Sequence, residues 1–262
     1  MQEKKYTVDD LMDILARLRG EGGCPWDRVQ THETIKKNMI EEAYEAVDAL
    51  EKGDDAMFAN ELGDVLLQVA FHAQIARERG VFGFDDVVGE ICRKMIDRHT
   101  HVFGTDTANS DTQALDTWEK NKKKEKGLST QTELMRDVIR MLPALVRAEK
   151  VQKKAADVGF DWDDVGGALE KSHEELSEME QAIASNDPVN IEEEIGDLLF
   201  SVVNVARFCK VNAEDALRHA TDKFIDRFAV LEQSAQQSGK NLSEMTLEEL
   251  EALWQQAKIQ KK

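Results

Sequence analysis

Apolar residues recur every three or four positions along most of the chain, which predicts α-helices that pack through one apolar face. Turns rich in Gly and Asp, such as Gly53-Asp54-Asp55 and Asn186-Asp187-Pro188, interrupt the pattern. The clearest helices are expected over residues 11–18, 34–50, 60–79, 165–185 and 189–210. No window alternates apolar and polar residues over the length of a strand. The sequence therefore predicts an all-α protein.

Six sequence features occur twice in the same order, so the chain contains an internal repeat. In both copies, 16 residues separate the last Glu of the first acidic motif from the first Glu of the second. We therefore expect two tandem copies of a bundle of roughly four helices, over residues 1–125 and 132–262. The polar stretch 121–131 would separate them, and Leu142-Pro143 would open the leading helix of the second copy. The six pairs are CPWD (24–27) with FDWD (160–163), EEAYE (41–45) with EELSE (174–178), ELGD (61–64) with EIGD (194–197), KMIDR (94–98) with KFIDR (223–227), Trp118 with Trp254, and Lys122 with Lys258.

The charge balance excludes several kinds of partner. With 52 Asp and Glu against 34 Lys and Arg, the net charge is −18. A nucleic acid polymer or an anionic membrane would require a basic surface. No apolar run approaches the roughly 20 residues of a membrane-spanning helix.

The three cysteines, Cys24, Cys92 and Cys209, are far apart and form no CxxC pair, which indicates reduced thiols in a cytoplasmic protein.

Each copy contains two acidic motifs whose spacing favours a metal-binding site. Residues three apart share a helix face, so Glu175 and Glu178 project together, as do Glu194 and Asp197. A short turn joins the two helices and makes them antiparallel neighbours, so the four carboxylates can converge. Clustered carboxylates raise one another's pKa and favour a bound cation. Hard oxygen ligands with open positions suit Mg²⁺.

The helices that carry the second motif are otherwise apolar, which argues against a simple solvated surface. In the second copy the polar positions step by three or four to form one stripe: Glu194, Asp197, Ser201 and Asn204. The first copy has the corresponding stripe Glu61, Asp64, Gln68 and His72. Gly63 and Gly196 lie inside these helices, where Gly is unfavourable. We expect a closely approaching helix or ligand to explain them.

The ordered set of motifs resembles the MazG family of all-α nucleoside triphosphate pyrophosphohydrolases. The resemblance rests on EExxE followed by ExxD, on CPWD near the start, on RHxHVF (98–103) and on VGFDW (158–162), and it covers nearly the whole chain. The family commonly has Pro between the two histidines of RHxHVF, where this chain has Thr100.

The resemblance implies Mg²⁺-dependent hydrolysis of (d)NTPs to (d)NMP and pyrophosphate, with a metal-bound water attacking the α-phosphorus. It also implies a homodimer, a role in nucleotide-pool control and the stress response, and a main catalytic unit in the second copy. The implied metal ligands are Glu175, Glu178, Glu194 and Asp197. Glu174 or Glu193 would accept the proton of the water, and the choice between them stays open. The implied nucleotide-binding residues are Lys171, Glu174, Glu193, Asp197, Lys223, Arg227, Trp254 and Lys258. A possible second site in the first copy comprises Glu42, Glu45, Glu61, Asp64, Lys94 and Arg98.

Two alternatives compete with this interpretation. A di-iron carboxylate bundle would need two ExxH motifs. Glu170 and His173 form one, but Ile40 occupies the position that matches His173 in the first copy. A non-catalytic, acidic helical scaffold would leave the carboxylates solvated, and neither Mg²⁺ nor nucleotide would then stabilise it.

Overall fold

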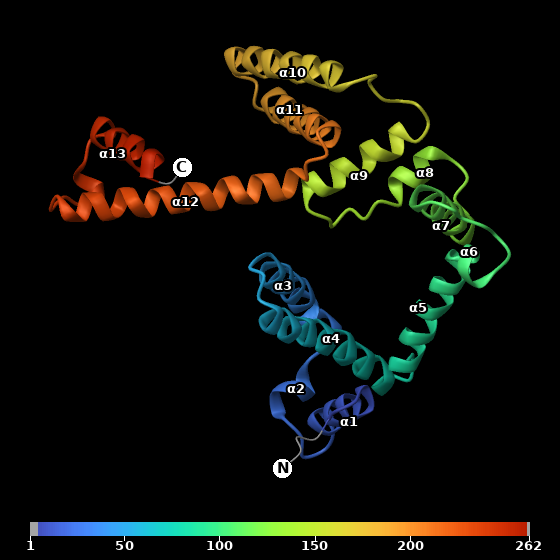
Figure 1. The fold of residues 1–262 in the computed structure, drawn as a ribbon. Coiled ribbons are helices and arrows are strands. Elements are labelled where there is room, and N and C mark those ends of the chain that lie inside the picture. The colour runs from blue at the N-terminus through green and yellow to red at the C-terminus, as the bar shows by residue number, and fades with distance from the viewer. Residues whose placement is uncertain (1–4, 261–262) are drawn as a thin grey trace. The chain divides into compact units, whose positions relative to one another are not determined.

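The computed structural model describes residues 5–260, and this part of the chain is helical and contains no strand (Figure 1). The chain divides into two compact units, residues 1–124 and 125–262. The all-α prediction is confirmed.

The first unit is centred on a hairpin of two long antiparallel helices, α3 and α4. α1 packs against α4. α5 comes directly after α4 in the chain and also contacts it. Leu15 of α1, Ile35 of α3, and Phe71 and Ile75 of α4 form the buried core. The helices are α1 (Val8–Arg19), α2 (Pro25–Val29), α3 (His32–Glu51), α4 (Asp55–Glu78), α5 (Phe84–Arg98), α6 (Thr100–Phe103) and α7 (Asp111–Glu125).

The second unit repeats this plan around the hairpin of α10 and α11. α9 packs on α11, as α1 packs on α4, and α13 packs on the long helix α12. The elements are α8 (Gln131–Arg136), α9 (Ala144–Ala156), α10 (Val165–Ser185), α11 (Pro188–Phe208), α12 (Ala213–Gln237), the short 3-10 helix η1 (Leu242–Glu244) and α13 (Leu247–Gln260).

The two hairpins align in sequence with a constant offset. α10 and α11 each begin 133 positions after α3 and α4, respectively. Both turns hold a residue with positive φ followed by an Asp that caps the next helix: Gly53 (φ 68°) and Asp54, Asn186 (φ 54°) and Asp187. The Asp side chains accept hydrogen bonds from backbone N–H groups in the first turn of α4 and of α11. The same local chemistry therefore fixes both hairpins.

Most helix boundaries lie within three residues of the sequence prediction, and two differences are larger. α4 begins at Asp55, five residues earlier than expected, because Asp54 caps it. The basic end of the predicted spacer belongs to α7, whose last turn carries Lys122, Lys123 and Lys124. Cations are favourable at a helix C-terminus. The non-helical spacer is thereby reduced to residues 126–130.

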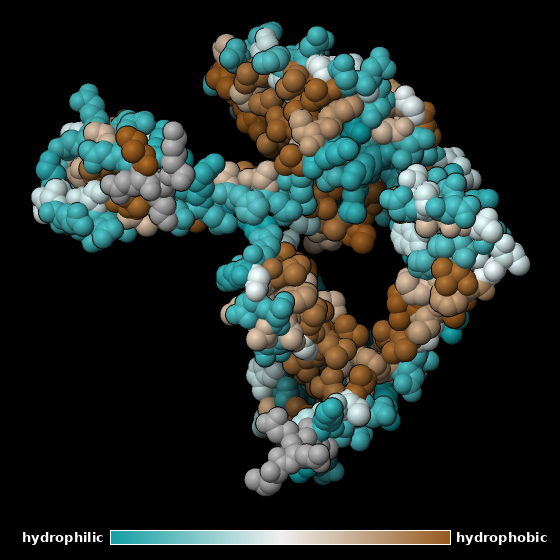
Figure 2. Space-filling view, viewed as in Figure 1, coloured by the Kyte–Doolittle hydropathy of each residue, from teal (hydrophilic) through white to brown (hydrophobic). Residues whose placement is uncertain are grey.

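Large apolar side chains remain exposed on both hairpins and on α12. Figure 2 shows apolar surface over α3–α4 and over α10–α11. Val47 of α3, Leu199 and Val202 of α11, and Phe224 and Ile225 of α12 are each about half exposed. Among the described residues, no helix is long and apolar enough to cross a membrane.

Candidate active site

Three carboxylates of the second unit converge between α10 and α11. Glu175 projects from α10, Glu194 and Asp197 project from α11, and one oxygen of each lies within 4.8 Å of one oxygen of each of the others. Glu175 is only 5% exposed. Its charge is offset by Lys171, whose Nζ lies 2.6 Å from the Glu175 carboxylate and 2.8 Å from that of Glu174. This buried acid, held by a single cation, is the innermost part of the cluster.

The electrostatics of the cluster favour an added cation. Loss of hydration raises the pKa of Glu194, and repulsion from Glu178, Glu175, Asp197 and Glu193 raises it further. Glu178 therefore lies close enough to interact with the other carboxylates, although it is outside the tight group of three. Hydrogen bonds to Glu174 and Glu175 raise the pKa of Lys171, so its ammonium is held in the charged form.

The donor set fits a hard divalent cation. All the converging atoms are carboxylate oxygens, which are the ligands that Mg²⁺ binds, usually with several waters retained. Glu175, Glu194 and Asp197 would supply direct ligands, and Glu178 lies nearby. Of the four acids that the sequence placed on facing helices, the structure brings three into one tight group and leaves Glu178 outside it.

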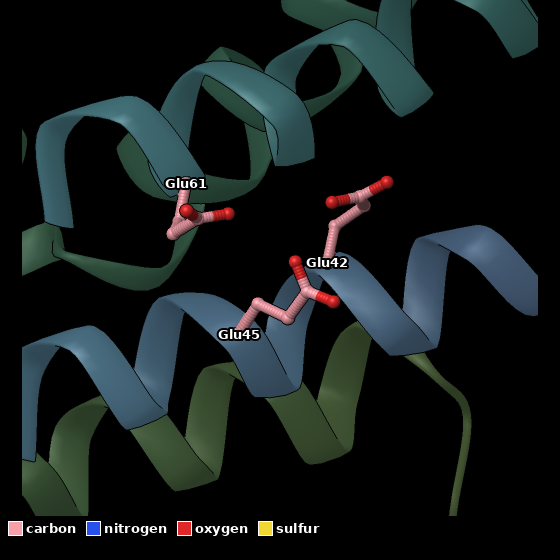
Figure 3. Close-up of side chains that lie close together, drawn as sticks. All are labelled: Glu42, Glu45 and Glu61. Atoms are coloured by element: carbon pink, nitrogen blue, oxygen red, sulfur yellow. The ribbon is translucent and has the colours of Figure 1, made fainter. Parts of the chain in front are cut away.

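The first unit has a matching cluster (Figure 3). Glu42 and Glu45 rise from α3 toward Glu61 of α4, with oxygens again within 4.8 Å of one another. Loss of hydration raises the pKa of Glu42, and repulsion from Asp64 and the other acids adds to it. Gln68, which is 7% exposed, donates its side-chain amide to Glu42 at 3.4 Å. Polar residues of the α4 stripe thus face α3.

The two clusters differ in their nearest cation. Asn38 stands 133 positions before Lys171, so the first cluster lacks the ammonium that holds Glu175 in the second. Asn60 instead donates weak hydrogen bonds to Glu61 and Asp64, each at 3.4 Å. The two clusters therefore share an arrangement of carboxylates but differ in the residue that matches Lys171.

The basic and aromatic residues expected near the nucleotide make no direct polar contact with the acidic cluster of the second unit. Across residues 5–260, Lys223, Arg227, Trp254 and Lys258 form no ion pair or hydrogen bond with the cluster. Trp254 of α13 instead packs on Phe224 of α12, with ring centroids 4.9 Å apart.

The corresponding residues of the first unit are similarly engaged elsewhere. The guanidinium of Arg98 lies 5.3 Å from the centre of the Trp118 ring, and the Lys122 ammonium lies 4.6 Å from it. This tryptophan face is thus covered by cations from its own unit. The roles assigned to these residues, and to Lys94, stay predictions.

Gly63 and Gly196 do not have the close neighbours we expected. A Cβ atom at either position would meet nothing within 4 Å. The packing of a single chain therefore gives no reason for a glycine there, and the expectation of a close approach within the chain is wrong.

Sequence reasoning missed polar contacts that bridge distant segments, and two of them join helices or segments next to the acidic hairpins. His32 and His72 stack with ring centroids 5.1 Å apart, and their Nδ1 atoms lie 2.8 Å apart. In the second unit Arg207 of α11 pairs with Asp161, and this pairing lowers the pKa of the Asp161 carboxyl. Each pair joins residues at least 40 positions apart, and no local pattern marks such contacts.

Comparison with known proteins identifies the family. The family model described as the MazG nucleotide pyrophosphohydrolase domain matches residues 30–103 and 168–229, which cover both hairpins except the first three residues of α10. The chain therefore belongs to the MazG nucleotide pyrophosphohydrolase family, a class of pyrophosphate-releasing hydrolases.

Full-length relatives agree with this assignment. The chain is 45% identical over 258 residues to the nucleoside triphosphate pyrophosphohydrolase/pyrophosphatase MazG of Thermotoga maritima, covering 98% of each chain. It is 43% identical over 256 residues to the nucleoside triphosphate pyrophosphohydrolase of Escherichia coli K12, covering 97% of each. A nucleoside triphosphate pyrophosphohydrolase of Mycolicibacterium smegmatis is 37% identical over 58% of this chain and 46% of its own length.

Proposed function

We propose that this protein hydrolyses nucleoside triphosphates to nucleoside monophosphate and pyrophosphate at the acidic cluster of its second unit, with Mg²⁺ as cofactor. The observation that carries the proposal is the convergence of Glu175, Glu194 and Asp197 within 4.8 Å in a chain of the MazG family. A scaffold would have no reason to bury Glu175 beside Glu194 and Asp197, because crowded carboxylates repel one another and Lys171 pairs with Glu175 but with neither of these two.

Glu175, Glu194 and Asp197 would hold the ion, with Glu178 close by. Bound Mg²⁺ would supply an acidified water and positive charge for the phosphate oxygens. This charge explains how a protein with a net charge of −18 binds an anionic substrate.

Glu193 is the better candidate for the base that accepts the proton of the attacking water. Glu174 is ion-paired with Lys171, at 2.8 Å, whereas Glu193 has no ion-pair partner within the described part of the chain. Lys171 lies beside the cluster and would also contact phosphate oxygens. Point cations of this kind stabilise negative charge that grows on a departing pyrophosphate.

We also propose that the protein acts as a homodimer. The apolar residues left exposed on α11 and α12 suit a second copy, and Lys223, Arg227, Trp254 and Lys258 would then act in the assembled bundle rather than within one chain. Removal of triphosphates would serve control of the nucleotide pool in the cytoplasm.

The direct test is to incubate the full chain with Mg²⁺ and each common nucleoside triphosphate, and to identify the phosphate product. Pyrophosphate is expected, and EDTA should abolish its release. Release of orthophosphate alone, or no hydrolysis of any triphosphate, would refute the proposal.

Two matched variants test which of the two units carries the hydrolytic activity. Asp197→Asn and its first-unit counterpart Asp64→Asn make the same change 133 positions apart. We expect Asp197→Asn to reduce kcat at least about 100-fold, and Asp64→Asn to retain most activity, with both variants folded by circular dichroism. A wild-type rate for Asp197→Asn would remove the second unit from the chemistry.

A further inference from the structure

Lys171 of α10 contacts two acids that differ in exposure. Its Nζ lies 2.6 Å from the Glu175 carboxylate and 2.8 Å from the Glu174 carboxylate. The side chain of Glu175 is 7% exposed, that of Glu174 is 57% exposed, and that of Lys171 is 39% exposed. The ammonium therefore lies at the edge of the acidic cluster, with one partner inside the cluster and one at the surface.

This ammonium compensates only part of the charge of the cluster. Glu194 and Asp197 have no ion-pair partner within residues 5–260. One positive charge on one side thus leaves two of the three converging carboxylates without a counter-ion. Their repulsion favours the uptake of a further cation, and carboxylate oxygens suit a divalent one.

The repeat shows that the buried acid does not require a lysine. Glu42 of the first unit matches Glu175 in position and accepts a hydrogen bond from the neutral amide of Gln68 at 3.4 Å. Ser201 stands at the position of Gln68 in the second unit, and its hydroxyl donates to a backbone carbonyl of its own helix at 2.9 Å. In the second unit Lys171 therefore contacts the buried acid with a charged group, where the first unit uses a neutral one.

The position of Lys171 allows its ammonium to be displaced from Glu175. The ammonium is a point charge at the end of a flexible four-carbon stem, and water reaches it. Glu174 would keep it paired after it left Glu175. A divalent ion bound to the Glu175 carboxylate would face this ammonium at close range, where like charges repel. The two cations therefore compete for the same buried acid.

We propose that Lys171 is a displaceable counter-ion of the second unit. Its ammonium holds Glu175 until Mg²⁺ binds there, and it is then released toward Glu174 and the phosphate oxygens of the substrate. The inference rests on the proposed function, because it concerns how the metal site of that function is filled.

Competition of this kind makes the second unit respond to the concentration of free Mg²⁺. The affinity for the ion is lowered by the free energy needed to displace the ammonium. An anionic substrate that draws the ammonium away raises that affinity, and by linkage Mg²⁺ raises the affinity for the anion. Lys171 thereby couples the uptake of the two ligands.

The first test measures Mg²⁺ binding to the full chain by isothermal titration calorimetry, without nucleotide. All proteins carry Asp64→Asn, which weakens the acidic cluster of the first unit. We expect Lys171→Asn to lower the Kd for Mg²⁺ at least about fivefold, the lower end of ordinary coupling between two binding events. Lys171→Arg keeps the charge and should stay near the wild-type value. Lys153→Asn removes a lysine that is paired with Glu149 outside the cluster, and it should leave the Kd unchanged.

The second test observes the ammonium directly. Nitrogen-15 NMR of the lysine side chains is recorded during a Mg²⁺ titration of the wild-type chain, with the Lys171 signal assigned from its absence in Lys171→Arg. The signal should shift with the same saturation curve as the calorimetric titration. It should not shift in Asp197→Asn, in which a ligand of the ion is lost. A Lys171 signal that stays unchanged at saturating Mg²⁺ would show that the ammonium is not displaced.

The outcomes separate this inference from the proposed function. If the wild type binds Mg²⁺ and releases pyrophosphate but Lys171→Asn keeps its Kd, the lysine does not compete with the ion, although the enzyme assignment stands. Weaker Mg²⁺ binding by Lys171→Asn would make the lysine a support of the site and would also overturn the inference. If the wild type neither binds Mg²⁺ nor hydrolyses a triphosphate, the proposed function itself fails. Thermal melts check folding, and the NMR titration of the wild type decides if Lys171→Asn does not fold.

Discussion

At the scale of single residues, Lys171 decides how the acidic cluster of the second unit is stabilised. A carboxylate that is almost fully buried, such as Glu175, needs either a cation or a proton. Lys171 supplies the charge in this unit, whereas Asn38 at the matching place in the first unit does not. A lysine one turn before an acidic motif is common on solvated helices, so only the burial of Glu175 shows that this pair matters.

Lys171→Asn therefore has a defined expected effect. Without the ammonium, Glu175 is buried among other acids, so the melting temperature in EDTA should fall by at least about 2 °C. Added Mg²⁺ should then raise the melting temperature more than it does in the wild type, because the ion replaces a lost positive charge. Differential scanning calorimetry with and without Mg²⁺ measures both effects.

Asn38→Lys is the reciprocal variant. The new ammonium would compete with any ion held by Glu42, Glu45 and Glu61, so the rise in melting temperature on adding Mg²⁺ should be no larger than in the wild type. An equal response of wild type and Lys171→Asn to Mg²⁺ would show that the ion does not bind at Glu175.

At the scale of helices, each hairpin depends on a turn that only some residues can adopt. Asn186 has φ 54°, in the left-handed region, where Gly53 stands in the first unit. Gly and Asn tolerate this conformation, whereas branched side chains pay about 1–2 kcal/mol. The sequence identified these turns correctly because Gly, Asn and Asp carry the information locally.

We expect Asn186→Gly to leave the free energy of unfolding nearly unchanged and Asn186→Val to lower it by about 1–2 kcal/mol. Urea unfolding followed by circular dichroism measures the difference. Equal stability of the two variants would mean that the turn rearranges without cost.

The stacked histidines couple α3 to α4 and make the first unit sensitive to acid. Burial lowers the pKa of His72, and the neighbouring charge of His32 lowers it further. The unfolded chain therefore binds more protons than the folded chain as the pH falls below the ordinary histidine pKa of about 6.5. Stability is full above that pH and decreases below it.

Val165 and Val205 occupy the matching positions in the second unit, so the double variant His32→Val with His72→Val installs the residues that the second unit has there. Thermal melts between pH 8 and pH 5 should show a smaller loss of stability for this double variant than for the wild type. A wild-type pH dependence in the variant would exclude the histidine pair as its cause.

At the scale of the whole molecule, large apolar side chains stay exposed in the single chain, which indicates that a second copy covers them. Ile225 of α12 is 59% exposed and Leu199 of α11 is 51% exposed. We expect sedimentation velocity to give the mass of a dimer, and Ile225→Glu to shift it toward the monomer, because a buried unpaired charge opposes association. A wild-type monomer at all concentrations would refute the dimer.

The sequence by itself determined the helices, the repeat and the pairing of the acidic motifs. These follow from periodicity, from turn residues and from spacing along a helix, all of which are local. The tertiary structure decided which acid is buried, that His32 meets His72, and that Arg207 pairs with Asp161. Those features depend on contacts between distant residues and on the volume that neighbouring helices leave, and a linear pattern does not encode them.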